Sequence, residues 1–522
     1  MGTNQRVSFF SFSFFLPILL AILSSVPSTV SGNGFSIREA TVRDLQLAFK
    51  YNRLTSRQLV EFYLEQIHRL NPIFHGISEV NPDALDLADK ADQERRTKAP
   101  ESLSRLHGIP IVLKDNIATK DKMNSTAGSF ALLGSVVPRD AGVVARLRKA
   151  GAIILGKASM TEWSFFRSTT APIGWSPRSG QGKNAYTLGN PCGSSSGSAI
   201  SVATNMAALS LGVETDDSII CPSSRNSVVG IKPTVGLTSR SGVVAVSPRQ
   251  DTVGPICRTV SDAAYVLEAI VGVDIHDHAT IKASKYIPKG GYAQFLRIDG
   301  LRGKRLGVVR DFENLLHLNP GGVSASIETF HQNLNTLRQR GAILVDNLKL
   351  DNITELYFTD YGELVALRAE FKLSLNAYLK ELIASPVRSL ADVIEFNKNN
   401  PVLEKIEYGQ DTMLQAQATN GIGKAEKAAR QNLKRLTKNG FVKLMKKNKL
   451  DALVTPVDIS SRILAIGGFP GISVPAGYTK DGPFGICFGG LKGSEPKLIE
   501  IAYGFEQATK IRKPPPLQNF KL

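Results

Sequence analysis

The stretch Pro191-Cys192-Gly193-Ser194-Ser195-Ser196-Gly197-Ser198-Ala199 and the stretch Glu214-Thr215-Asp216-Asp217-Ser218-Ile219 together decide the architecture of this chain. The mostly apolar sequence between these two small-residue loops has room for one helix and one strand. A helix of about ten residues rises roughly 15 Å at ~1.5 Å per residue. A strand over 207–213 returns a comparable distance at ~3.3 Å per residue. We therefore expect the two loops, and with them Ser194 and Ser218, to lie close together.

An upstream segment shows the same succession of strand, helix and strand. Gly108-Ile109-Pro110-Ile111-Val112-Leu113 reads as a short apolar strand that delivers a single lysine, Lys114. A helix follows, with Asp140 as the expected N-cap and Gly151 as the expected end. The apolar run Ala152-Ile153-Ile154-Leu155 is the next strand. A helix between apolar strands is typical of a βαβ unit in a parallel sheet, so the chain is predicted to be an α/β protein.

The second half of the chain changes character and then returns to strands. Residues 285–445 hold long amphipathic helices, such as 324–340 and 424–447, and are predicted to be a more variable helical region that covers the core. Three later runs are predicted to be strands: 452–456, 472–475 and 498–501. Because neither an internal repeat nor a clear linker is present, we expect one compact domain over residues 32–522.

The N-terminus has the pattern of a targeting segment. Arg6 precedes an uncharged run over 7–26 that is dense in Phe and Leu, and small and polar residues follow. This pattern predicts a secretory signal peptide over 1–31, cleaved near Ser31. An uncleaved anchor is the alternative, since the run approaches the roughly 20 residues that a span needs. The expected location is the secretory pathway or the extracellular space, or a membrane if the anchor stays.

Composition sets limits on the class of protein. The chain has 522 residues, 42% hydrophobic and 21% charged, which is ordinary for a globular protein able to bury a core. Its formal net charge of +17 comes from scattered Lys and Arg residues. Neither a basic-aromatic stripe nor zinc-finger spacing is present, so nucleic-acid binding is disfavoured. A solvated basic surface is the simpler interpretation.

Cysteines and glycosylation motifs add two further expectations. The four cysteines show no framework spacing, and Cys192 and Cys221, near the two serine loops, are interpreted as small buried thiols. Two sequons begin at Asn124 and Asn352. If the chain enters the secretory pathway, these sequons predict a glycoprotein.

The serine loops leave several chemistries open. A phosphate-binding P-loop would require Gly-Lys-[Ser/Thr], but Ser198 is followed by Ala199 and Ile200. The loop does fit the Gly-x-Ser-x-Gly pattern of Ser-His-Asp hydrolases, yet nothing in the sequence nominates any of the seven histidines as a base. A lysine can replace the histidine if it is desolvated enough to be neutral, because its ordinary pKa is about 10.4. Lys114 is placed for that role, although a strand-end lysine can also extend into water.

At these residues the chain resembles the amidase signature family. The match includes 108–116, the serine-glycine loop at 193–198, and 212–233, which ends in Val229-Gly230-Ile231-Lys232-Pro233. Further similarity runs through 251–262 and 451–456, and it covers nearly all of the chain after residue 36. The peptide-amidase-like branch of the family is the most similar. The resemblance implies a single α/β/α domain, with a mixed twisted central sheet covered by helices on both faces.

The family resemblance also implies an activity and a set of roles. The implied reaction is hydrolysis of carboxamide C–N bonds in a small amide substrate, without a metal or cofactor. Ser218 resembles the nucleophile that forms an acyl-enzyme, Ser194 the bridging serine that follows a cis peptide bond, and Lys114 the base. The implied oxyanion hole is formed by backbone N–H groups of Thr215, Asp216, Asp217 and Ser218. The oligomeric state is not implied.

One residue departs from the family pattern. The family usually has glycine or alanine immediately before the nucleophile, whereas this chain has Asp217. Aspartate tolerates the left-handed backbone conformation better than most residues, but its carboxylate can repel a developing oxyanion. The alternative is therefore a catalytically weakened or inactive member that retains a ligand pocket. A transamidase subunit is disfavoured, because a secretory segment would separate it from its partner subunits. A purely structural role would not require a lysine and two serines at these spacings.

Overall fold

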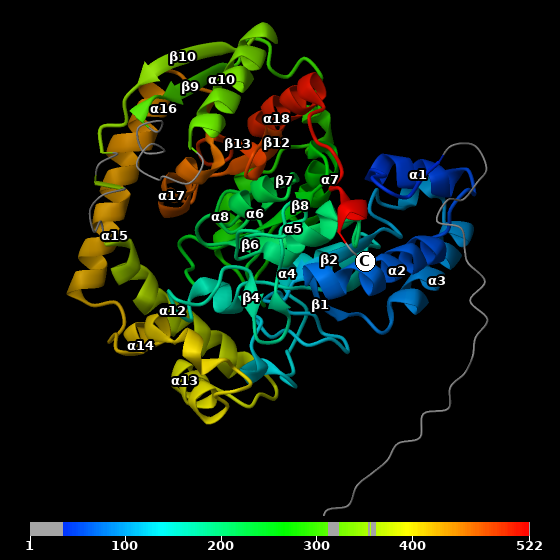
Figure 1. Cartoon of the computed structure of the whole chain (residues 1–522), viewed down its shortest axis with the longest axis vertical. Coiled ribbons are helices and arrows are strands. Elements are labelled where there is room, and N and C mark those ends of the chain that lie inside the picture. The colour runs from blue at the N-terminus through cyan, green and yellow to red at the C-terminus, as the bar shows by residue number, and fades with distance from the viewer. Residues whose placement is uncertain (1–34, 312–322, 353–354, 357–361, 521–522) are drawn as a thin grey trace, which may run out of the picture. The chain divides into compact units, whose positions relative to one another are not determined.

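The computed structural model describes residues 35–311, 323–352, 355–356 and 362–520 (Figure 1). The chain from Ile37 to Leu522 forms one compact unit. The segment predicted to be a leader, 1–31, lies outside the described residues. None of the helices among the described residues combines the length and apolar character needed to cross a membrane.

A mixed sheet of eleven strands forms the centre of this unit, in the order β1-β3-β2-β6-β8-β7-β12-β13-β11-β9-β10. The strands are β1 (Ile77–Val80), β2 (Pro110–Lys114), β3 (Ile153–Ala158), β6 (Leu209–Glu214), β7 (Val229–Lys232), β8 (Thr252–Cys257), β9 (Arg305–Val309), β10 (Ile343–Leu348), β11 (Ala452–Pro456), β12 (Gly471–Thr479) and β13 (Gly482–Gly489). A separate two-stranded ribbon pairs β4 (Trp175–Ser176) with β5 (Gly180–Gln181).

The register of the parallel strands confirms the predicted βαβ units. β2 pairs in parallel with β3 on one side and with β6 on the other. Lys114 lies opposite Ala158, and Leu113 lies opposite both Lys157 and Leu211. Since parallel neighbours end at the same edge of a sheet, the end of β2 and the loop after β6 lie beside each other.

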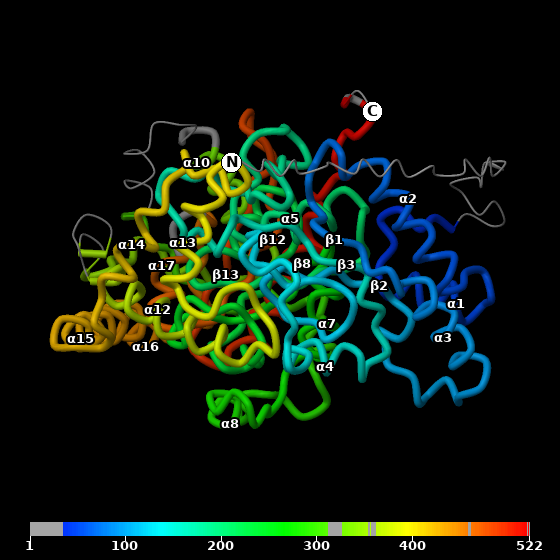
Figure 2. The backbone as a smooth tube through the Cα atoms, turned by 90° about the horizontal axis from the view of Figure 1, so that it is seen from below, coloured from blue at the N-terminus to red at the C-terminus, as the bar shows by residue number. Residues whose placement is uncertain are grey.

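Helices flank the sheet, as the resemblance implied (Figures 1 and 2). The α-helices are α1 (Val42–Lys50), α2 (Ser56–Phe74), α3 (Ala84–Thr97), α4 (Gly142–Lys149), α5 (Ser196–Ala203), α6 (Ile220–Arg225), α7 (Val260–Ile270), α8 (Ala279–Ala283), α10 (Val323–Gln339), α12 (Glu363–Glu381), α13 (Leu390–Asn399), α14 (Asp411–Gln417), α15 (Lys424–Thr437), α16 (Lys443–Lys447), α17 (Val457–Gly467) and α18 (Glu495–Thr509). In both views α1, α2 and α3 gather beside β1, while α12, α14 and α15 lie on the opposite side.

The packing partners of the helices divide them into two layers. In one layer, α5 contacts β2, β6 and β8, and it packs beside α6, which also contacts α17. In the other, α7 contacts β7 and β8 and packs against α4 and α18. Every residue of α5 is buried, and its small side chains let the helix lie close to the sheet.

Two local predictions were wrong. The run 498–501, predicted to be a strand, lies inside helix α18, where its apolar residues continue at helical spacing to Ala502 and Phe505. A short apolar run does not distinguish a strand from a buried helix. Asp140 does not cap α4, whose N-cap is Ala141. The Asp140 carboxylate instead accepts hydrogen bonds from Lys120 N at 2.7 Å and Arg148 Nε at 3.0 Å.

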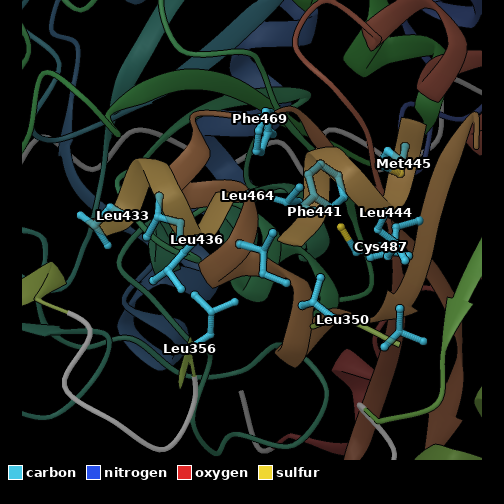
Figure 3. Packing of buried hydrophobic residues seen from close by; sticks show 14 of the residues in the cluster. Leu350, Leu356, Leu433, Leu436, Phe441, Leu444, Met445, Leu464, Phe469 and Cys487 are labelled. Atoms are coloured by element: carbon cyan, nitrogen blue, oxygen red, sulfur yellow. The ribbon is translucent and has the colours of Figure 1, made fainter. Parts of the chain in front are cut away.

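The region 285–445 supplies both helices and strands. Besides its helices it contributes β9 and β10, which extend one edge of the central sheet. Its apolar side chains join a buried cluster with those of α17 and β13, part of which is shown in Figure 3. This cluster includes Ile220 and Cys221 of α6, the helix that follows Ser218. The helical region therefore packs directly against the second serine loop.

Candidate active site

Three side chains predicted from the sequence meet at one point. Lys114 is the last residue of β2, Ser194 lies in the loop before α5, and Ser218 lies between β6 and α6. Lys114 Nζ donates a hydrogen bond to Ser194 Oγ at 2.7 Å, and Ser194 Oγ donates to Ser218 Oγ at 3.0 Å. The three polar groups thus form one continuous chain of hydrogen bonds in the interior of the protein.

Main-chain contacts hold the two serine loops together. Ser195 N donates to Ser218 O at 3.2 Å, and Ser195 Oγ donates to Val213 O at 3.1 Å. The Gly193–Ser194 peptide bond is cis, as the resemblance implied. α5 runs away from the first loop and β6 returns beside it. Ser194 and Ser218 are therefore neighbours in the fold although they are 24 residues apart in sequence.

The Lys114 amine is fully buried and has two hydrogen-bond partners. Besides Ser194 it donates to the main-chain carbonyl of Val213 at 2.9 Å. Burial lowers the pKa of Lys114 to about 7, although the negative charges of Asp251 and Glu214 act in the opposite direction. A substantial fraction of the amine is therefore neutral at neutral pH, which a general base requires.

A neutral Lys114 amine reverses the direction of the hydrogen-bond chain. It keeps hydrogens to donate to Val213 O and gains a lone pair that accepts from Ser194 Oγ. Ser194 can then accept a hydrogen bond from Ser218, since hydroxyl groups rotate to suit their partners. The same distances therefore allow a proton to move from Ser218 through Ser194 to Lys114.

Two buried acids hold the loop that carries Ser218. One carboxylate oxygen of Glu214 accepts hydrogen bonds from Ile219 N at 2.5 Å and Ile220 N at 2.9 Å. Asp251 accepts from Thr215 Oγ1 at 2.6 Å. Neither acid was assigned a role from the sequence. Glu214 could have been predicted to hold the loop, because it is an acidic residue at the end of an apolar strand, directly before a loop of small residues.

The backbone after β6 presents hydrogen-bond donors near Ser218. Within the described ranges, the N–H groups of Thr215, Asp216 and Ser218 donate no hydrogen bond to another protein group. Burial and the nearby Glu363 carboxyl raise the pKa of Asp216 to about 8. This shift favours the uncharged form of Asp216 beside these donors.

Asp217, at the position where the resemblance implies glycine or alanine, has a left-handed backbone conformation. Its φ is 61°, in the left-handed region that aspartate tolerates better than most residues. An oxygen of its carboxylate lies within 4.8 Å of the sulfur atoms of Cys192 and Cys221. Asp217 therefore takes the left-handed conformation that the loop requires, and its carboxylate lies near the two sulfur atoms.

The prediction that Cys192 and Cys221 are buried thiols was wrong, because they form a disulfide. Cys192 precedes Ser194 by two residues and Cys221 follows Ser218 by three, so the bond joins the two serine loops. The spacing of the cysteines gave no sign of this, since only the close approach of the loops brings them within bonding distance. The other two cysteines, Cys257 and Cys487, are buried and free. Among the described residues, the only grouping with metal-ligand spacing is Asp217 with these two sulfurs, which the disulfide occupies.

Comparison with known proteins identifies the family. The family model described as Amidase matches residues 58–465. A probable amidase of Arabidopsis thaliana is 58% identical over 98% of this chain and 98% of its own length. A putative amidase of Schizosaccharomyces pombe is 36% identical over 93% of this chain and 88% of its own length. The crystal structure of native peptide amidase from Stenotrophomonas maltophilia matches with a TM-score of 0.83 and 40% identity, covering 91% of this chain and 98% of that one.

The chain therefore belongs to the amidase family, as the sequence resemblance indicated. It is a hydrolase that acts on amide C–N bonds. The comparisons do not favour the alternative of an inactive member that only retains a ligand pocket.

Proposed function

We propose that the protein hydrolyses amides through an acyl-enzyme formed on Ser218, with Ser194 and Lys114 as a proton relay. The observation that carries the proposal is the unbroken hydrogen-bond chain from Lys114 Nζ through Ser194 Oγ to Ser218 Oγ. A buried amine with a pKa of about 7 supports it, because such an amine can accept a proton at neutral pH.

In the first half of the reaction, Ser218 Oγ attacks the carbonyl carbon of the amide. Its proton passes to Ser194 as the proton of Ser194 passes to Lys114. Lys114 then returns a proton through Ser194 to the leaving nitrogen, the C–N bond breaks, and an ester to Ser218 remains. In the second half, water attacks the ester along the same relay and releases the carboxylic acid.

The backbone after β6 supplies the proposed oxyanion hole. The N–H groups of Thr215, Asp216, Asp217 and Ser218 are the donors assigned to it. Such donors act best when they are fixed before the reaction, and the loss of one costs ~10²–10³ in rate. Glu214 and Asp251 fix this loop from both ends through their contacts with Ile219, Ile220 and Thr215.

The proposed substrates are peptide-like carboxamides. This part of the proposal rests on the similarity to peptide amidase, which covers 98% of that chain. Small aryl amides are suitable reporter substrates, because they require only the common step of C–N cleavage.

We place the mature protein in the secretory pathway, with the leader 1–31 removed near Ser31 and glycans at Asn124 and Asn352. Asn124 Nδ2 donates to Glu79 Oε1 at 3.1 Å and Asn352 Nδ2 donates to Leu436 O at 2.8 Å. A glycan takes one of the two hydrogens of Nδ2, so the amide keeps one hydrogen for its present partner. Intact-mass measurement of the secreted chain tests both parts; a mature chain that still begins with Met1 contradicts leader removal.

A fluorophosphonate probe tests the proposed nucleophile. We expect covalent labelling of Ser218 and its loss in Ser218→Ala, with aryl-amide hydrolysis reduced by at least about 10⁴-fold. Ser196→Ala is the matched control, because Ser196, the first residue of α5, follows Ser194 by two residues but its hydroxyl donates to Cys192 O, outside the relay. Full hydrolysis by Ser218→Ala, or labelling of another serine, would overturn the mechanism.

A further inference from the structure

A cavity of about 860 Å³ lies among the first helices of the described chain, away from the three relay side chains. α1, α3, the segment 100–105 and Tyr265 of α7 form its walls. Figure 1 shows α1 and α3 together on the right, in blue. The volume is within the ~300–1,000 Å³ of typical small-molecule sites. The catalytic assignment leaves this cavity without a role.

Positive charge predominates at this cavity. Five cationic side chains line it: Arg43, Lys50, Arg95, Arg96 and Arg105. The single acidic lining residue is Asp92, whose carboxylate accepts hydrogen bonds from Ser56 N at 2.8 Å, Arg57 N at 3.0 Å and Arg95 Nη1 at 2.6 Å.

The other four cations keep their charge available to a ligand. Arg43, Lys50, Arg96 and Arg105 are exposed and form no ion pair with any carboxylate of the described residues. The cavity therefore presents several uncompensated positive charges, which attract anions.

Apolar residues form the larger part of the rest of the lining, beside the polar Gln46, Asn52, Thr55 and Ser104. The Arg95 guanidinium lies 4.0 Å from the centre of the Phe49 ring, and the Arg105 guanidinium lies 5.0 Å from the centre of the Tyr265 ring. The remaining apolar lining residues are Val42, Leu47, Leu54, Pro100 and Leu103. Apolar walls beneath a cationic rim suit a molecule with an anionic head and a hydrocarbon tail.

Hydrogen bonds hold the cavity in shape. Gln46 Nε2 donates to Arg105 O at 2.8 Å and to His107 O at 3.0 Å, which ties α1 to the segment that closes the cavity. Arg95 Nη2 donates to Ser56 Oγ at 2.8 Å. A Cβ at Gly108 would lie 2.3 Å from Arg95 Nη2, so only glycine fits beside this guanidinium. Such preorganisation lowers the entropy cost of binding.

We propose that this cavity is a second binding site, which takes one single-chain amphipathic anion with a carboxylate or phosphate monoester head. It is distinct from the relay, because none of Lys114, Ser194 and Ser218 lines the cavity, and Gly108, which lies beside the lining residue Arg95, precedes Lys114 by the length of β2. The five residues of β2 span roughly 16 Å at ~3.3 Å per residue.

Isothermal titration with decanoate and with decyl phosphate tests the site. The enzyme is first treated with a fluorophosphonate at its serine, and the cavity variants described below assign the binding to this site whether or not that serine is labelled. We expect one ligand per chain, with affinity that decreases as salt rises. Decanol and decyltrimethylammonium have the same tail without the negative charge and are expected to bind at least about tenfold more weakly.

Paired variants locate the binding. Arg43→Gln combined with Arg96→Gln should weaken decanoate binding by about tenfold or more, because two exposed cations of the rim are removed. Arg53→Gln is the control: Arg53 lies close to the Tyr51 ring and does not line the cavity. Thermal unfolding of each variant checks that the fold is retained.

Several results would overturn the proposal. These are the absence of decanoate and decyl phosphate binding, equal binding by the paired variant, and equal affinity for decyltrimethylammonium. Binding only to phosphatidylglycerol vesicles, without binding to either monomeric anion, would assign the charge to a membrane surface and would also overturn it.

Discussion

Two buried lysines lie near the ends of neighbouring strands, Lys114 on β2 and Lys157 on β3. They are alike in burial, in the direction of their pKa shifts and in the kinds of groups that they contact. Both are fully buried, and burial lowers the pKa of Lys114 to about 7 and that of Lys157 to about 8. Each amine donates to one main-chain carbonyl and one serine hydroxyl. For Lys157 these are Ile117 O at 2.5 Å and Ser125 Oγ at 2.8 Å.

The difference lies one hydrogen bond further on. Ser194 continues the chain of Lys114 to Ser218, whereas Ser125 Oγ returns to Ile117 O at 3.4 Å and closes a loop with Lys157. Side chains alternate along a strand, and Leu113 rather than Lys114 lies opposite Lys157, so the two lysines point to opposite faces of the sheet. A buried lysine with a lowered pKa is therefore not by itself a catalytic base. What distinguishes the two lysines is the next hydrogen-bond partner of the serine: Ser218 for Ser194, and Ile117 O for Ser125.

Replacing each lysine by methionine gives the largest contrast. Lys114→Met should lower kcat for an aryl amide by about 10²–10⁴-fold, since a general base is lost. Lys157→Met should leave kcat of the folded protein within a few-fold but lower the free energy of unfolding by about 3 kcal/mol, because the buried Asp115 loses its cation.

Steady-state kinetics and urea unfolding of both variants measure these effects. The comparison fails if Lys157→Met loses as much kcat as Lys114→Met while it remains folded. Binding of the fluorophosphonate probe, followed over time, reports separately on the reactivity of Ser218 in each variant.

The pH dependence of kcat/KM also distinguishes Lys114 from Lys157. The reactive form needs neutral Lys114, so kcat/KM should fall about tenfold per pH unit below about pH 7 and level off above it. The pH profile of kcat/KM should show no second inflection at the pKa of about 8 of Lys157, because that amine does not exchange protons with the substrate. An activity that is constant between pH 5 and pH 8 would contradict the assignment of Lys114 as the base.

The disulfide distinguishes the surroundings of Lys114 from those of Lys157. Cys192 and Cys221 are 29 residues apart, and closing a loop of this length stabilises a fold by about 3–4 kcal/mol. Cys192→Ser combined with Cys221→Ser should therefore lower the free energy of unfolding by that amount and reduce kcat, since both serine loops lose their link.

Dithiothreitol added to the wild type should reproduce the loss, measured by thermal unfolding and activity together. Cys257→Ala is the control, because this buried thiol on β8 has no disulfide partner. Unchanged unfolding of the double variant would show that packing alone holds the loops.

Asp217 gives the smallest predicted effect. Asp217→Gly should raise kcat by a few-fold, because glycine adopts a φ of 61° readily and removes a carboxylate from the proposed oxyanion loop. Asp217→Asn keeps the size of the side chain and removes only its charge, so it separates electrostatic from steric effects. A lower kcat in both variants would indicate that the carboxylate supports the loop.

The sequence, with its family resemblance, was sufficient for much of the fold and for naming the three side chains that the structure joins by hydrogen bonds, Lys114, Ser194 and Ser218. Strand and helix periodicity located β2, β3, α5 and β6, and the spacing of the two loops brought Ser194 near Ser218. The run 498–501 was mistaken for a strand because local pattern does not separate a short strand from a buried helix. Asp140 was mistaken for a cap because a carboxylate that fits an N-cap also fits a contact with Lys120 and Arg148.

What the sequence determined by itself was local: which residues lie on strand ends and in small-residue loops, and the family pattern that names them. Only the tertiary structure decided that Cys192 bonds to Cys221, that Glu214 and Asp251 fix the serine loop, and that Lys157 ends in a closed loop of hydrogen bonds. The physical reason is that a side chain's protonation and bonding depend on burial and on neighbours distant in sequence, which no single stretch of chain contains.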